Sequence, residues 1–177
     1  MKKEKYIALL SFVFCVSLIV GLSIACGGSD SGDKASTASI TGKVGQTLKT
    51  DEFEITVTSV SSSKSVGGEY FGEKASEGAV FVIVNFKSKN ITNSPISSSD
   101  LPEAKLIDPN DIVYEEASGA TISYQTDKNI NTKVLSDLNP GVTEKNASVF
   151  EVSSENWKKA GWRVRIDADE KVDVTVK

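Results

Sequence analysis

The sequence predicts an all-β protein, an antiparallel β-sandwich, and three observations support this prediction. Short segments in which apolar and polar residues alternate recur along the chain, as strands half-buried in a sheet require. Turn-forming residues such as Asn139-Pro140-Gly141 separate these segments. After the first 25 residues no long helical pattern is found, so the strands are expected to form two sheets packed about 10 Å apart.

The first half of this domain contains the clearest strands. We expect a first strand over residues 40–48, loosened by two glycines, and a second over 53–60, where apolar residues alternate with Glu and Thr. Residues 61–78 read as a long polar loop. Residues 79–86 are apolar on both faces, which predicts a central strand covered on both sides.

The second half begins with a predicted hairpin. Its strands, 104–107 and 112–114, flank Asp108-Pro109-Asn110-Asp111, in which proline presets a turn and the Asx side chains hydrogen-bond their own backbone. We interpret these oxygens as turn chemistry rather than as a calcium site, because the ligand spacing of a calcium loop is absent.

The remaining elements are shorter or less regular. Residues 117–133 are polar, with a short strand predicted at 121–124, and 134–138 is predicted as an edge strand. Residues 142–152 and 162–166 read as core strands, and 172–176 as a final segment at a sheet edge. Between the core strands, 153–161 suits one or two helical turns, capped by Ser153 or Ser154 and stopped by Gly161.

Several of these pieces together are similar to a known family. In chain order they are Gly45-Gln46-Thr47, the strand with Phe53, Ile55 and Val57, the strand ending in Asn85-Phe86, Leu106-Ile107-Asp108, Leu138-Asn139-Pro140-Gly141, and Val149-Phe150-Glu151-Val152. Over about residues 40–166 the chain resembles DUF4352, a family of domains of unknown function. The resemblance implies an immunoglobulin-like sandwich, typical of secreted bacterial proteins and lipoproteins, and it implies no catalytic residues.

The first 25 residues read as an export signal. Three lysines precede an apolar run over residues 6–25, and small Ala25 precedes Cys26. The segment resembles a bacterial lipoprotein signal peptide, which implies cleavage before Cys26 and acylation of its thiol. Residues 1–25 are then the signal helix, 26–39 a flexible tether of small polar residues, and 40–177 the sandwich domain. The alternative is an uncleaved anchor, since roughly 20 apolar residues span a bilayer.

This reading predicts a protein in the cell envelope, lipid-anchored to a membrane and facing outside the cytoplasm. Stable anchoring takes two or more lipid chains, which the lipoprotein pattern supplies. Without its first 25 residues the chain carries 17 basic and 23 acidic residues, a net charge of −6. An acidic domain without clustered Lys and Arg is a poor nucleic-acid binder.

Composition also limits the chemistry. The chain has no histidine, and Cys26 is the single cysteine after the predicted cleavage site. Histidine-dependent nucleophilic triads and histidine-bearing zinc sites are therefore excluded. We expect no cofactor, no metal site and no catalytic residue.

Two pairs of aromatic residues are candidate contact sites. Tyr70 and Phe71 lie in the glycine-rich loop, where binding surfaces are often built. Trp157 and Trp162 lie near lysines and arginines and could stack on a sugar or peptide. For both pairs the alternative is that the rings pack against the sheets.

The sequence favours a non-catalytic interaction module with a protein or glycan partner in the envelope. A second hypothesis is a carboxylate-dependent hydrolase of envelope glycans, in which acids such as Glu115, Glu116, Asp167, Asp169 and Glu170 would have to converge in one cleft. A third is a purely structural or host-exposed surface protein.

Overall fold

The structure is a computed structural model that describes residues 39–130 and 136–177, all within the unit Ser36–Lys177. The predicted signal peptide, Cys26 and all of the predicted tether except Ser39 lie outside the described residues. In the described part no helix is long and apolar enough to cross a membrane.

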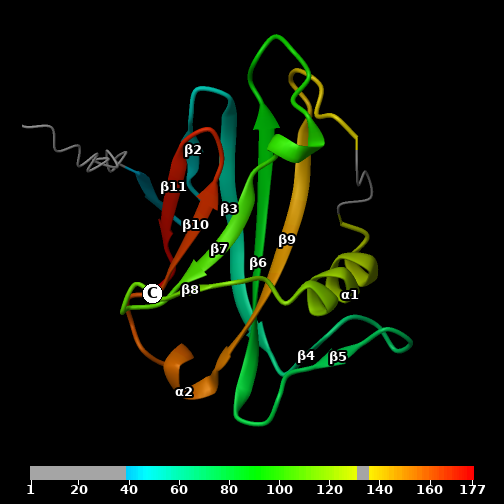
Figure 1. Ribbon diagram of the computed structural model, residues 1–177, viewed down its shortest axis with the longest axis vertical. Helices are drawn as coiled ribbons and strands as arrows, with labels where there is room; N and C mark the ends of the chain where they lie inside the picture. Colours follow the sequence, from blue (N-terminus) through cyan, green and yellow to red (C-terminus); the bar gives the residue numbers. More distant parts are fainter. Residues whose placement is uncertain (1–38, 131–135) are drawn as a thin grey trace, which may run out of the picture. The chain divides into compact units, whose positions relative to one another are not determined.

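The first of two packed sheets contains five strands (Figure 1). In spatial order they are β1 (Ile40–Lys43), β11 (Lys171–Thr175), β10 (Arg163–Asp167), β7 (Glu103–Ile107) and β8 (Val113–Tyr114). All neighbours are antiparallel except β1 and β11, which are parallel. The prediction that residues 172–176 lie at a sheet edge is wrong, because β1 pairs with the free side of β11.

The second sheet contains four antiparallel strands: β2 (Thr47–Lys49), β3 (Phe53–Ser63), β6 (Ala79–Asn90) and β9 (Thr143–Ser153). The single strand predicted over residues 40–48 is in fact two strands in different sheets. They separate at a turn in which Gly45 has φ +87°, a conformation that glycine adopts without the steric cost of a side chain.

The core between the two sheets confirms the predicted β-sandwich. The alternating residues Phe53, Ile55 and Val57 of β3 all point into it and are almost fully buried. Trp162, which has no exposed surface, packs its ring 5.1 Å from that of Trp157 and 5.5 Å from that of Tyr114. These rings close one end of the core.

A smaller apolar cluster covers the outer face of the second sheet. Its members are Val66, Phe81, Ile83, Ala120 and Val149. The predicted loop over residues 61–78 is therefore wrong in part: β3 runs on to Ser63, and a hairpin of β4 (Ser65–Val66) and β5 (Glu73–Lys74) follows. Burial of β6 on both faces is confirmed.

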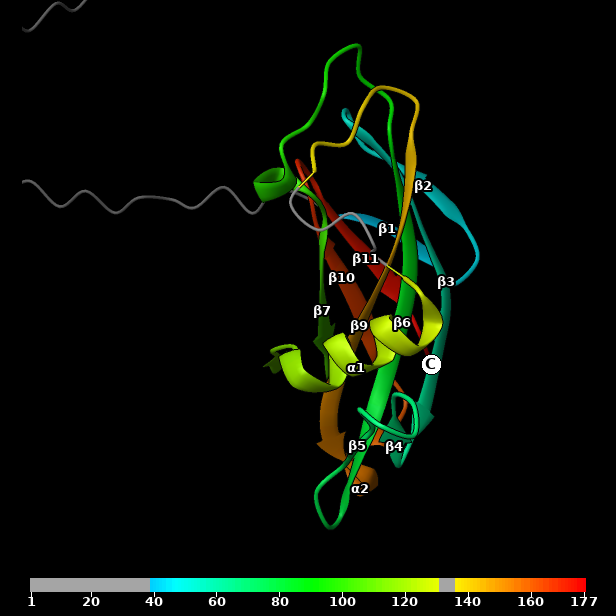
Figure 2. The same cartoon turned by 90° about the vertical axis from the view of Figure 1, so that its right-hand side faces the viewer.

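The strand predicted at residues 121–124 is also wrong, because this segment belongs to the helix α1 (Ser118–Lys128). Figure 2 looks onto α1, which packs against β9 beside the β4–β5 hairpin. The predicted helical turns after β9 are confirmed as α2 (Ser154–Trp157), capped by the Ser153 hydroxyl.

A short 3₁₀ helix, η1 (Ser98–Asp100), precedes β7. Of the edge strand predicted at residues 134–138, residues 134 and 135 lie outside the described part. Leu138 makes an isolated antiparallel bridge with Ile96 rather than extending a sheet.

Candidate functional site

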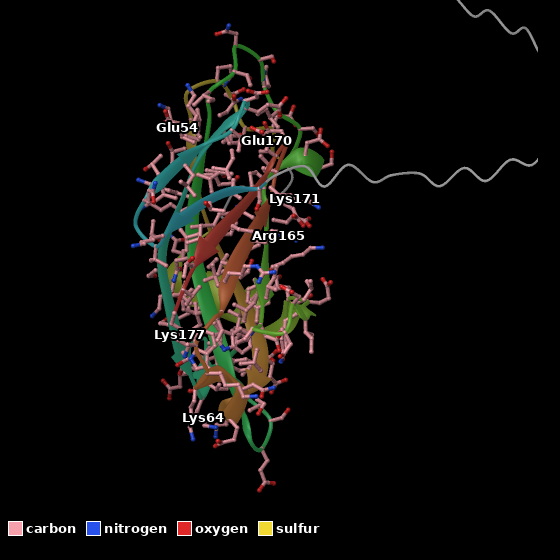
Figure 3. All side chains as sticks on the ribbon, turned by 90° about the vertical axis from the view of Figure 1, so that its left-hand side faces the viewer. Glu54, Lys64, Arg165, Glu170, Lys171 and Lys177 are labelled. Carbon is pink, nitrogen blue, oxygen red and sulfur yellow. The ribbon has the colours of Figure 1, made fainter. Side chains whose placement is uncertain are left out.

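The outer face of the first sheet is a network of paired charges. Arg165 binds Asp173 through two hydrogen bonds of 2.8 and 2.9 Å, and Lys105 lies 3.6 Å from Asp167. Figure 3 shows Arg165 on this face, with Glu170 in the turn between β10 and β11 and Lys171 at the start of β11. Arg165 and Asp173 satisfy each other across neighbouring strands, which is a structural role. Asp167 Oδ1, by contrast, is buried without a hydrogen-bond partner in the described part of the chain.

The carboxylates considered for acid–base chemistry do not form one group. Asp167 belongs to the charged face of the first sheet. Asp169 accepts hydrogen bonds from the Thr50 hydroxyl (2.7 Å) and the Glu52 N–H (3.1 Å), so it joins the β10–β11 turn to the β2–β3 turn. Glu115 and Glu116 lie elsewhere, on the segment between β8 and α1. No group of three or more acidic residues suited to a metal ion occurs in the described ranges.

The turn after β7 has the predicted Asx chemistry. The Asp108 carboxylate accepts hydrogen bonds from the backbone N–H groups of Asn110 (2.8 Å) and Ile112 (3.0 Å). Burial raises the pKa of Asp108, but these hydrogen bonds outweigh burial and hold it below its ordinary value. The carboxylate oxygens of Asp108 therefore stabilise the turn by accepting its backbone N–H groups.

The two tryptophans do not form an exposed aromatic patch. Trp162 is fully buried and donates its indole N–H to the Asn156 carbonyl at 3.1 Å. Trp157 is half-buried, and the Lys177 ammonium lies 3.7 Å from its ring centroid. The indoles therefore pack the end of the sandwich, which was the alternative interpretation of this pair.

Tyr70 and Phe71 are the most exposed large apolar side chains in the described part of the chain, at 87% and 75%. They lie at the tip of the β4–β5 hairpin, whose base is held by buried Val66. A side chain at Gly67 would come within 2.6 Å of the Phe71 carbonyl oxygen, so this glycine allows the tight crossing that presents both rings. The alternative that these rings fold back on the sheet is wrong.

A groove of about 590 Å³ opens between α1, β9 and the start of β7. This volume lies in the range typical of ligand sites. Its lining includes Glu103, Ala104, Glu115, Glu116, Glu144 and Ser148. They come from β7, β9 and the segment between β8 and α1, so the groove lies beside the edge strand β9 of one sheet and the β7–β8 edge of the other.

Sequence reasoning missed this groove. The sequence suggested Glu115 and Glu116 as candidate acids. The carboxylates expected to join them, those of residues 167, 169 and 170, lie elsewhere. The groove instead brings Glu115 and Glu116 together with Glu103 and Glu144. These four glutamates come from three separate segments, and no local signal in the sequence shows that the segments meet.

The chain matches the family described as "Domain of unknown function (DUF4352)" over residues 42–160. It is 38% identical over 127 residues to the uncharacterized protein YxkC of Bacillus subtilis (strain 168), covering 71% of each chain.

Solved structures share the fold. A conserved hypothetical protein from Bacillus anthracis is 29% identical, with a TM-score of 0.67 over 74% of this chain and 93% of that one. The candidate lipoprotein ycdA from Bacillus subtilis is 16% identical, with a TM-score of 0.50 over 74% of this chain and 38% of that one. The second likeness concerns the fold alone.

Proposed function

Because this chain belongs to the DUF4352 family, we propose that it is a lipid-anchored protein of the cell envelope whose sandwich is a non-catalytic binding module. The groove carries this proposal, since a recess of about 590 Å³ between rigid strands and a helix offers a preformed site. The exposed aromatic hairpin offers a second contact surface beside α1.

The anchor rests on the sequence around Cys26. A charged start, an apolar run and Ala25 before Cys26 form a lipoprotein-type signal. A family fold that also occurs in a candidate lipoprotein supports the same location.

Mass spectrometry of the chain purified from its own membranes tests the anchor. We expect a mature N-terminus at Cys26 carrying acyl chains, and a Cys26→Ser variant that is neither cleaved there nor acylated. A chain that retains Met1 without lipid would contradict the proposal and support the uncleaved anchor.

Photo-crosslinking tests the binding module. A photoreactive amino acid at Ile122, which lines the groove and is 64% exposed, should cross-link an envelope component in intact cells. The same probe at Glu77, an exposed residue in the turn before β6, serves as the control. Equal labelling at both positions would argue against a binding role for the groove.

One observation favours a second candidate, a carboxylate-dependent glycan hydrolase. The groove gathers Glu103, Glu115, Glu116 and Glu144, and such hydrolases use two carboxylates facing one bond. Release of soluble fragments from purified cell-wall glycan, lost in a Glu115→Gln, Glu116→Gln variant, would replace the binding proposal with this one. Glycan left intact by the wild-type chain would remove the hydrolase.

A further inference from the structure

We infer that the groove takes an extended basic peptide, which pairs its backbone with the open edge of β7 and places lysine or arginine side chains against Glu103, Glu115 and Glu116. This inference rests on the proposed binding function and names the ligand class for the same site. Three independent features of the groove carry it: an unpaired strand edge, the distribution of charge and a polar floor.

The strand edge comes from the shortness of β8. Within β7, only Leu106 and Ile107 pair with β8, so residues 103–105 have no strand partner on that side in the described part of the chain. The Asp108 N–H donates to the Ile112 carbonyl, so by alternation the N–H and C=O of Ala104 face the same edge. Ala104 lines the groove. An extended peptide can therefore continue the ladder where β8 stops.

The opposite wall does not offer such an edge. On β9, α1 already occupies the backbone groups: the Thr121 hydroxyl binds the Val149 N–H and the Gln125 amide binds the Ala147 carbonyl. A peptide that enters the groove thus finds β7 open and the middle of β9 covered. This difference gives the bound peptide one edge to pair with, that of β7.

The charge of the groove selects a basic ligand. Glu103, Glu115 and Glu116 are exposed at its rim. Lys105, the basic residue of the lining, lies 3.6 Å from Asp167 on the outer face of the sheet, so its charge is partly balanced there. The rim is left with negative charge, which attracts cationic side chains and repels acidic peptides.

The floor of the groove supplies a polar contact. Ser148 is only 5% exposed and lines the groove. It alternates along β9 with the core residues Phe150 and Val152, so its side chain points between the sheets. No hydrogen bond of its hydroxyl is found among the described residues. A hydroxyl without a protein partner at the floor of a groove is available to a ligand group or a ligand-bound water.

The size of the groove fits a short segment. Its β9 wall runs from Glu144 to Ser148, which at about 3.3 Å per residue is on the order of 13 Å. Three to four extended residues occupy that length, so two side chains of one face lie within reach of the rim glutamates.

A binding titration tests the inference on the full chain in detergent micelles. The probe is a capped pentapeptide of alternating lysine and valine, carrying a fluorescent label. Matched peptides replace lysine by glutamate, or carry N-methyl groups on the backbone amides that would pair. We expect the lysine peptide to bind, the glutamate peptide not to bind, and the N-methyl peptide to bind at least tenfold more weakly.

Two variants locate the site. Glu115→Gln with Glu116→Gln should weaken binding of the lysine peptide about three- to tenfold, with the loss shrinking as salt is added. Glu52→Gln with Glu77→Gln makes the same change in net charge at exposed positions outside the groove and should leave binding unchanged. Equal weakening by both pairs would show a non-specific charge effect and overturn the site.

The remaining outcomes are also decisive. N-methyl and parent peptides of equal affinity would overturn the pairing with β7. A chain that binds no peptide, yet is acylated on Cys26 and cross-links through Ile122, would overturn the ligand class while the proposed function stands. A chain that fails all three tests would overturn both.

Discussion

The hydroxyl of Thr121 accepts a hydrogen bond of 2.9 Å from the Val149 N–H, and this contact joins α1 to the edge of the second sheet. One turn later Gln125 donates its amide to the Ala147 carbonyl at 2.7 Å. The Ala117 N–H donates to the Val149 carbonyl at 2.8 Å. The helix and the residue before it thus bind backbone N–H and C=O groups of β9 that could otherwise pair with another strand. The middle of the β9 edge is therefore covered.

Replacing Thr121 by alanine should therefore destabilise the domain. Thr121 is 3% exposed, so its loss leaves a buried N–H without a partner, at a cost of about 1–3 kcal/mol in the free energy of unfolding. Thr121→Ser keeps the hydroxyl and should retain most of the stability that Thr121→Ala loses. Urea unfolding measures both, with Thr126→Ala on the exposed side of α1 as control. Alanine is a better helix former than threonine, so Thr126→Ala should cost no stability. Equal losses at positions 121 and 126 would contradict a specific role for the hydrogen bond.

The same helix shows where prediction from sequence stops. Strands such as β3 and β6 carry their burial pattern in the order of their residues, so alternation predicts them. α1 has only Ala120 and Thr121 buried and no side-chain cap at its start. Its stability comes from docking on β9, about 25 residues away in the chain, and such a contact leaves no periodic signal.

The candidate site follows the same rule. Tyr70 and Phe71 could be selected from the sequence because a glycine-rich loop surrounds them. Whether the rings are exposed depends on how Val66 anchors the hairpin. The groove could not be predicted, because Glu103, Glu116 and Ser148 meet only once β7, β9 and α1 are in place.

Trp162→Phe should destabilise the domain by about 1–3 kcal/mol, because the smaller ring underfills the core and leaves the Asn156 carbonyl without its indole donor. The blue-shifted part of the fluorescence emission should disappear with it, since Trp162 is fully buried. Trp157→Phe, at a half-buried position, is the control and should cost less. A larger loss for Trp157 would contradict the assignment of Trp162 as the core residue.

Asp173→Asn should lower stability at neutral pH but not in acid. Burial raises the pKa of Asp173, but hydrogen bonds and charge from Arg165, with a hydrogen bond from Ser39, outweigh it and hold the pKa below its ordinary value. The stability of this depressed carboxylate is present above its unfolded pKa, near 3.9, and is lost as pH falls through the lower folded value. Because the pair is partly solvated, we expect about 1 kcal/mol or less.

Thermal unfolding of Asp173→Asn at several pH values measures this dependence. The difference from wild type should be largest above about pH 5 and shrink below about pH 4. Glu77→Gln, which removes one negative charge in the exposed turn before β6, is the control for the change in net charge. A difference that grows toward low pH would contradict a depressed pKa for Asp173.

The β4–β5 hairpin carries two exposed rings and one buried valine, and their substitution should affect stability differently. Tyr70→Ser with Phe71→Ser should change the free energy of unfolding by no more than about 0.5 kcal/mol, because the folded state leaves both rings in solvent. Val66→Ala, at a 5% exposed position in the same hairpin, should cost about 2 kcal/mol through its two lost methyl groups and the resulting cavity. Urea unfolding distinguishes them. If the serine pair costs as much as Val66→Ala, the rings pack in solution and cannot serve as a contact surface. If the serine pair costs nothing, the two aromatic rings are not required for folding. Their exposed surface is then available for contact with an envelope partner, as proposed.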